Sequence, residues 1–239
     1  MNNLAQRIRS FEKRLQANMD KVFCPTHLSL GQEWVAVELA NVMRSDDWLF
    51  STHRNHHHYL AKGGSESRLW DEIMGLPTGL NGGFAGSQSI TDPSINFHSS
   101  AIVGGLVGVA AGTALALKLN NSDAVAICCL GDAGTEQGVF WETLNFAALQ
   151  ALPLVFVIEN NGKSVDAHIS ERQATPLTPR IPSFGVEVCE SVVSAVERCR
   201  GHRRPTFFEA RVTLECAHLN MATMLDLCTV ATATDGDVK

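Results

Sequence analysis

Apolar positions along the chain follow two periods in turn, and this alternation predicts helices and strands in succession. In the first half, helical periodicity covers residues 4–19 and 32–43, and a shorter helix is expected at 65–74. The second half adds a Gly/Ala-rich helix and then strands that alternate with helices. These elements are expected at 101–119 (helix), 124–130 (strand), 139–150 (helix), 153–159 (strand), 190–200 (helix) and 205–212 (strand).

Two stretches follow neither period and are expected to be irregular. Residues 51–64 are rich in His and Gly, and residues 75–100 are dense in Gly, Ser, Asp and Pro. An irregular stretch as long as the second is usually functional when it lies inside a compact domain.

The order of the expected elements indicates the fold class. Apolar strands that alternate with helices are typical of an α/β fold, a parallel sheet covered by helices on both faces. We expect a single domain at 1–220 and a weakly patterned, partly disordered tail at 221–239. Ligands of such sheets bind at the carboxyl ends of the strands, so the site is expected where the strands at 124–130 and 153–159 end.

Composition narrows the class of partner and the compartment. The net charge of −6 at pH 7, without a block of like charges, argues against nucleic acid. The apolar run 101–119 is rich in Gly and Ala and lacks basic flanks, so we expect a buried helix and no membrane contact. Seven cysteines without a framework spacing indicate reduced thiols in a cytoplasmic protein.

Candidate chemistry lies at two strand ends. The sequence GDAGTEQG, residues 131–138, places Asp132 among small residues after one strand, and the next strand ends in Asn160 and Asn161. A carboxylate and an amide oxygen suit Mg²⁺, and the glycines let backbone N–H groups approach a diphosphate. From spacing alone, the alternative is that Asp132 caps the following helix and the asparagines form a turn.

Longer motifs around these residues carry a family resemblance. The segment GDAGTEQGVFWETLNFAALQALPLVFVIENN resembles the thiamine diphosphate motif, a Gly-Asp-Gly opening closed by paired asparagines. Upstream, HLSLGQEWVAVELANVMRSDDWLFSTHRNHHHYLAKGG and SSAIVGGLVGVAAGTALALKLN resemble the alpha subunit of the thiamine diphosphate-dependent 2-oxo acid dehydrogenase first component (pyruvate, acetoin and branched-chain types) more than transketolase. The resemblance covers about residues 8–216. It implies the thiamine diphosphate-binding fold, with thiamine diphosphate and Mg²⁺ as cofactors.

The resemblance also implies roles for residues after the two predicted strands. Asp132 and Asn161 would bind Mg²⁺, with the backbone carbonyl of Lys163 as a third ligand. Backbone N–H groups of Ala133 and Gly134 would meet the diphosphate.

The other implied ligands come from upstream. His53 and Arg54 match the family's Tyr-Arg pair, and Arg54 would make charge-assisted bonds to the diphosphate. The backbone of Ala101 and Val103 would hold the aminopyrimidine ring.

Histidines are the candidates for proton transfer. His56 matches the family's active-site histidine near the thiazolium, and His218 is a second candidate. Without the resemblance, the three consecutive histidines at 56–58 would indicate a solvated or metal-binding loop. No Cys or carboxylate lies beside them at zinc spacing.

The chain departs from the family pattern at several positions. Ala133 replaces the second glycine of the motif, which is tolerated if its φ is negative. Ser89 stands where the family has a histidine, and Leu214 where an arginine would bind diphosphate. The family's C-terminal helical region has no counterpart after about residue 220, as in a trimmed member. These departures weaken the expectation that the chain docks onto a large dehydrogenase complex.

The resemblance implies a partner. The cofactor needs a glutamate beside its pyrimidine ring, and in this family a separate beta subunit supplies it. We therefore expect αβ pairs or an α2β2 tetramer. The Gly/Ala face of 101–117 is expected either to contact the partner or to pack in the core.

The expected function is that of an alpha subunit that is active only with its beta subunit. The enzyme would cleave the bond next to the carbonyl of a 2-oxo acid such as pyruvate. It would transfer the acyl or hydroxyalkyl unit to an acceptor such as a lipoyl domain or an acyl carrier protein. One alternative is ketol transfer from a ketose phosphate to a carrier-protein thiol or an aldehyde. The other is a non-catalytic partner subunit that has kept the fold.

Overall fold

A mostly parallel sheet of seven strands forms the centre of the part of the molecule that the computed structural model describes, residues 3–218. Its strands are β1 (Trp48–Ser51), β2 (Thr91–Asp92), β3 (Phe97–Ser99), β4 (Ala126–Gly131), β5 (Leu154–Asn160), β8 (Glu187–Val188) and β9 (Thr206–Arg211). Their order across the sheet is β2-β3-β1-β4-β5-β9-β8, and every neighbouring pair except β2–β3 is parallel. The expected parallel sheet is thus confirmed.

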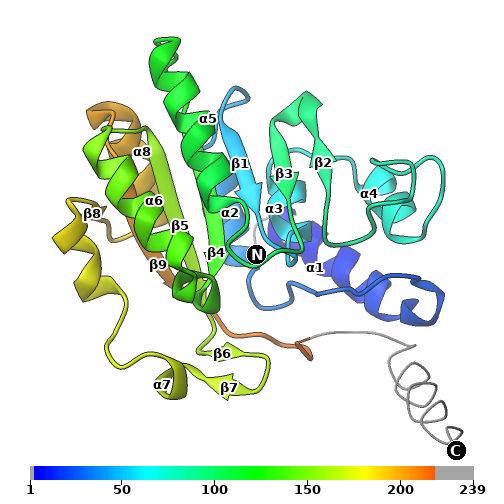
Figure 1. Ribbon diagram of the computed structural model, residues 1–239. Helices are drawn as coiled ribbons and strands as arrows, with labels where there is room; N and C mark the ends of the chain where they lie inside the picture. The colour runs from blue at the N-terminus through cyan, green and yellow to red at the C-terminus, as the bar shows by residue number, and fades with distance from the viewer. Residues whose placement is uncertain (1–2, 219–239) are drawn as a thin grey trace, which may run out of the picture.

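Helices cover both faces of this sheet (Figure 1). One face packs against α1 (Asn3–Gln16), α2 (Glu33–Val42), α3 (His56–Ala61), α4 (Glu66–Ile73) and α8 (Val192–His202). The other packs against α5 (Val107–Leu119) and α6 (Gly138–Leu149). No helix within residues 3–218 is both long and apolar enough to cross a membrane.

The two central strands show why both faces are covered. In β4, Ile127 and Cys129 belong to one buried cluster, whereas Cys128 and Leu130 belong to the other. Successive side chains of a strand point to opposite faces, so a strand that is apolar throughout needs a layer on each side.

Smaller elements complete the described part of the chain. A hairpin pairs β6 (Lys163–Ser164) with β7 (Ala167–His168), and α7 (Ile169–Arg172) follows it directly. Four 3₁₀ helices are η1 (Met19–Lys21), η2 (Pro93–Ile95), η3 (Asp132–Glu136) and η4 (Thr178–Phe184).

Some sequence expectations were wrong around β1. No strand was expected at Trp48–Ser51, although this short apolar strand pairs with both β3 and β4. The expected loop at 51–64 contains α3, and the irregular stretch 75–100 contains β2 and β3. Strands of two to four residues are too short to establish a period of two, which explains why the pattern did not reveal them.

The Gly/Ala-rich helix also begins later than expected, at Val107 instead of residue 101. Gly104, in the turn before it, has a φ of +75°, and a Cβ there would lie 3.0 Å from the Gln137 side chain. The turn therefore needs glycine at this position. The division into a domain at 1–220 and a tail remains a prediction, and residues 221–239 lie outside the described residues.

Candidate functional site

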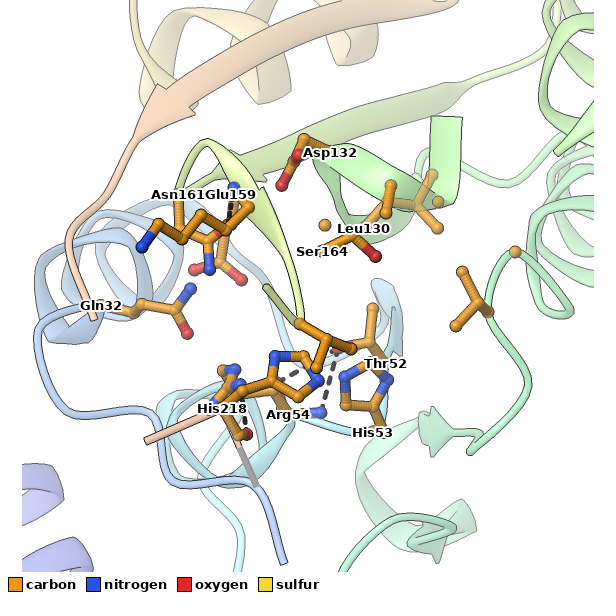
Figure 2. A pocket seen from close by; sticks show the side chains of 17 residues that line it. Gln32, Thr52, His53, Arg54, Leu130, Asp132, Glu159, Asn161, Ser164 and His218 are labelled. Carbon is orange, nitrogen blue, oxygen red and sulfur yellow. Dashed lines mark hydrogen bonds between the residues drawn. The ribbon is translucent and has the colours of Figure 1, made fainter. Parts of the chain in front are cut away.

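The segments that follow β1, β4, β5 and β9 meet at the carboxyl edge of the sheet. They line a pocket of about 170 Å³ (Figure 2). Of the residues singled out from the sequence, the pocket is lined by His53, Arg54, Val103, Asp132, Ala133, Gly134, Asn161, Lys163 and His218. Ala101 and His56 are the two candidates that do not line it. The expectation that neighbouring parallel strands bring Asp132 and Asn161 to one edge agrees with this placement.

Asp132 is the first residue of η3 and is almost fully buried. The Nη2 of Arg172 donates to its Oδ2 at 2.5 Å, and the same guanidinium pairs with Glu136. Burial raises the pKa of Asp132, and Arg172 acts in the opposite direction. The carboxylate is therefore held in place and neutralised by a cation from α7.

The paired asparagines at the end of β5 have different surroundings. Asn160 is buried, accepts a hydrogen bond from Gly162 N at 2.8 Å and donates one to Glu209. The side chain of Asn161 accepts a hydrogen bond from Lys163 N at 3.0 Å and lines the pocket. Both amide oxygens therefore accept from the N–H two residues ahead and shape the turn, but only Asn161 lines the pocket.

Arg54 follows β1 and is buried. Its guanidinium donates to the carbonyl of Leu28 and, at 3.0 Å, to the carbonyl of His218. Burial lowers its pKa, while Glu12 and Glu159 oppose that shift. Arg54 thereby ties the segment after β9 to the pocket wall and places a positive charge there.

His53 and His218 lie at the same end of the pocket, as Figure 2 shows. The ring of His27 packs edge-on against both, at centroid distances of 4.4 Å and 5.2 Å. His27 precedes α2 in the quoted segment HLSLGQE, but sequence reasoning gave it no role. Three imidazoles from separate parts of the chain thus gather at one end of the pocket.

The run His56–His58 lies elsewhere, inside the core at the start of α3. His56 Nδ1 contacts Glu12 Oε1 at 3.1 Å, and its Nε2 contacts Ser87 Oγ at 2.8 Å. Both ring nitrogens are therefore engaged away from the pocket. The structure does not bring His56 to the other candidate residues, and a solvated loop is excluded because all three side chains are buried.

His57 and His58 share one buried carboxylate. His57 Nε2 lies 3.0 Å from Glu159 Oε1, and His58 Nε2 lies 3.5 Å from Glu159 Oε2. Burial lowers the pKa of each imidazole to about 3 and raises the pKa of Glu159. Glu159 also lines the pocket, so it connects the core histidines to the site.

Three further pocket or near-pocket residues were not singled out from the sequence. Glu159 directly precedes the paired asparagines, and Gln32 lies in the GQE motif, so both had a local signal. Arg172 had none, because its contact with Asp132 depends on how the hairpin folds back.

The residues around the pocket fit a magnesium diphosphate by their chemistry. Asp132 and Asn161 supply hard oxygen donors, and Arg54 and Lys163 supply positive charge for an anion. The Oε1 of Gln32 is buried in the wall without a hydrogen-bond partner among the described residues. A buried polar atom of this kind is satisfied when a ligand or water donates to it.

Two of the three departures from the family pattern can be placed in the structure, and the third remains unexplained. Ala133 lies in η3 and is not among the residues with positive φ, so it needs no glycine. Leu214, at the position where an arginine would bind diphosphate, does not line the pocket. Nothing in the structure explains Ser89.

The chain is similar in sequence to known proteins over most of its length. The family model described as dehydrogenase E1 component matches residues 3–213. The alpha subunit of acetoin:2,6-dichlorophenolindophenol oxidoreductase from Bacillus subtilis (strain 168) is 34% identical over 226 residues, which cover 88% of this chain and 68% of the relative.

Two further similar proteins are matched over smaller shares of their own length. The pyruvate dehydrogenase E1 component subunit alpha of Rhizobium meliloti (strain 1021) is 32% identical over 200 residues, 78% of this chain and 57% of that protein. Transketolase from Campylobacter jejuni has a TM-score of 0.66 at 17% identity, covering 89% of this chain and 38% of that one. The transketolase likeness shows the fold alone.

Proposed function

Because the chain belongs to the dehydrogenase E1 component family, we propose that it is the alpha subunit of a heteromeric enzyme that acts on a 2-oxo acid. The family depends on thiamine diphosphate, and its alpha subunits work with a beta subunit. The enzyme cleaves the bond next to the carbonyl of a pyruvate-like donor and transfers the acyl or hydroxyalkyl unit to an acceptor. A lipoyl domain or an acyl carrier protein fits the acceptor role.

One observation carries the proposal: Asp132, Asn161 and Lys163 line one pocket with the η3 residues Ala133 and Gly134. In this proposal, Asp132 and Asn161 hold Mg²⁺ together with the carbonyl of Lys163. The backbone N–H groups of Ala133 and Gly134 hold the diphosphate. Because Arg172 already bonds to Asp132, a metal at this position would replace that bond.

The remaining pocket residues position the cofactor and neutralise its charge. Arg54 and His53 bind the diphosphate end of the cofactor. The backbone near Val103 holds the aminopyrimidine ring. Ala101 is a less supported partner for that ring, because it does not line the pocket. Thiamine diphosphate, when bound, supplies the electron sink for cleaving a bond beside a carbonyl. His218 is the better supported proton-transfer residue, because its ring faces the pocket whereas His56 is buried against Glu12 and Ser87.

The beta subunit is proposed to cover the outer face of α5 and the turn before it. Ile102 is 70% exposed, and Val109 is 50% exposed. A Cβ added at Gly108 or Gly112 would meet nothing within 4 Å, so small residues line this open face while Ala110 and its neighbours pack in the core. The sequence left open whether this Gly/Ala face contacts the partner or packs in the core. In this proposal, one side of α5 contacts the partner and the other side packs in the core. An αβ pair or an α2β2 tetramer is compatible with such a face.

Product analysis tests the activity. The chain, mixed with its beta partner, thiamine diphosphate and Mg²⁺, is expected to release CO₂ from pyruvate or another 2-oxo acid. The matched control is the same mixture carrying Asp132→Ala, which should release none. Consumption of a ketose phosphate without CO₂ would replace this proposal by ketol transfer. No turnover of either donor, together with no cofactor binding, would favour a non-catalytic subunit.

A further inference from the structure

Residues 212–218, here called the strap, follow β9 and run across the loop that precedes α2. Glu215 N donates to the carbonyl of Leu30 at 2.9 Å. The Sγ of Cys216 donates to the carbonyl of Leu28 at 3.5 Å. The strap ends at a residue that lines the pocket, so its path decides where that side chain lies.

A glycine in the loop allows this close contact. Gly31 has a φ of +96°, and a Cβ added there would overlap the backbone carbonyl oxygen of Thr213 and lie 3.3 Å from the Cγ of Glu215. Gly63 has nearly the same φ, +93°, but a Cβ added there would meet nothing within 4 Å. Both positions favour glycine for their backbone conformation. At Gly31 alone of the two, the strap also leaves no room for a side chain.

Charged side chains fasten the strap to two helices. Arg9 of α1 donates to both carboxylate oxygens of Glu215, at 2.7 Å and 2.9 Å. The same guanidinium pairs with Glu33 of α2, whose Oε2 also accepts from Gly31 N at 2.9 Å. A bidentate contact of this kind fixes direction as well as distance. The strap is therefore oriented from α1 and from the first residue of α2.

The strap carries His218 to the pocket, where its ring lies beside Arg54 (Figure 2). Arg54 Nη2 donates to the carbonyl of His218 at 3.0 Å. The His218 ring centroid lies 5.2 Å from that of His27 and 6.2 Å from that of His53. Burial and the positive charge of Arg54 lower the pKa of the His218 imidazole, and Asp166 acts in the opposite direction. The pKa of this ring therefore reports whether it occupies its place.

We propose that Gly31 is a positioning residue, which sets the place of His218 by letting the strap approach the loop, while the pair of Arg9 and Glu215 keeps the strap there. Gly31 does not line the pocket and acts only through His218. Its effect on turnover rests on the proposed function, because that function gives His218 the proton-transfer role. Its effect on the position of the ring does not.

Titration of the His218 ring by NMR, in the purified chain without cofactor, tests the positioning. In Gly31→Ala the added methyl group displaces the strap, so the pKa of His218 should rise towards the ordinary 6.5. His218→Gln identifies the resonance. The matched control is Gly63→Ala, which has the same positive φ but meets no neighbouring atom and should leave the pKa of His218 unchanged. An unchanged pKa in a folded Gly31→Ala protein would overturn the proposal.

A charge reversal tests the strap without changing the glycine, and it decides if Gly31→Ala does not fold. Arg9→Glu places a third carboxylate beside Glu215 and Glu33, so the strap should separate and the pKa of His218 should rise. Adding Glu215→Arg to this variant restores opposite charges and should restore the lowered pKa. A pKa that stays low in Arg9→Glu would contradict the role of the pair.

Turnover by the mixture with the beta subunit, at saturating thiamine diphosphate and Mg²⁺, separates positioning from a general loss of structure. Gly31→Ala should slow turnover about 100-fold, the loss expected when a reacting group is misplaced by about 1 Å. The double variant with His218→Gln should be no slower than His218→Gln alone, because both changes remove the same contribution. Losses that add would show that Gly31 acts through another group and would overturn the proposal. Normal turnover of His218→Gln would instead reject the proton-transfer role of His218, while the NMR titration would still decide the positioning.

Discussion

The two halves of the short sequence STHRNHHH have opposite surroundings. His53 and Arg54 line the pocket, whereas His56, His57 and His58 are buried in the core. The boundary between them is the start of α3 at His56, and the residues from His56 to Leu60 are buried. Closeness in sequence to a binding residue therefore does not place a histidine in the site. The partners of each imidazole show its role better: Glu12 and Ser87 for His56, and the rings of His27 and His218 for His53.

The largest effect is expected for a substitution in the pocket. Asp132→Ala removes the one carboxylate proposed to bind Mg²⁺, and magnesium-dependent binding of thiamine diphosphate should fall below detection in a direct titration. Glu136→Gln is the matched control, because Glu136 also pairs with Arg172 but does not line the pocket. Retained affinity in the Asp132 variant would mean that the metal binds elsewhere.

On the core side, His56→Ala should lower stability. It leaves the Glu12 carboxylate buried without its main partner, and breaking a buried pair in this way costs about 3–5 kcal/mol of unfolding free energy. Ser87→Ala removes only a neutral partner of the same ring and should cost about 1 kcal/mol. Denaturant unfolding measures both. Unchanged stability with turnover reduced ~10²–10⁴-fold would instead give His56 the acid–base role implied by the family resemblance.

The buried histidines should also make stability depend on pH. The pKa values of His57 and His58 are about 3 in the folded state, below the ordinary 6.5, because burial disfavours the charged rings. The unfolded chain then binds more protons between these values, so stability is full above pH 6.5 and falls as the pH drops. Each histidine contributes about 1.4 kcal/mol per pH unit between roughly pH 6 and pH 4.

Unfolding free energies measured from pH 7 to pH 4.5 test this dependence. His27 and His53 change the stability in the same direction as His57 and His58. The variant His58→Gln removes one imidazole, so the slope of unfolding free energy against pH should fall by the equivalent of one proton. A stability that stays constant over this range would show that the histidines already carry protons in the folded state.

The smallest effect is expected at the edge of the pocket. Arg172→Gln frees the Asp132 carboxylate from its 2.5 Å ion pair, so Mg²⁺ no longer displaces a bound cation. Affinity for Mg²⁺ in the presence of thiamine diphosphate should rise by at most about tenfold, equivalent to about 1.4 kcal/mol. Weaker binding would mean that Arg172 contacts the bound diphosphate and assists it.

The long and regular elements could be predicted from the sequence. The strands β4 and β5 and the helix α6 between them have clear periods, so the edge carrying Asp132 and Asn161 could be located from the pattern. The strand β1 and the helix α3 could not be predicted, because a four-residue strand has no measurable period and three histidines have no apolar pattern. The ring contacts of His27 and the ion pair of Arg172 join distant segments, and only the fold reveals them.

The central claim is that this chain supplies one half of a cofactor site. In the proposal, its pocket residues contact a diphosphate and a metal, and a beta subunit supplies the activating glutamate and the opposite wall. The decisive measurement is consumption of a 2-oxo acid by the purified alpha chain alone, compared with an equimolar mixture with the beta partner, at saturating thiamine diphosphate and Mg²⁺. The account predicts no turnover by the alpha chain and full turnover by the mixture. Full activity from the alpha chain alone would place the activating glutamate in this sequence and contradict the half-site.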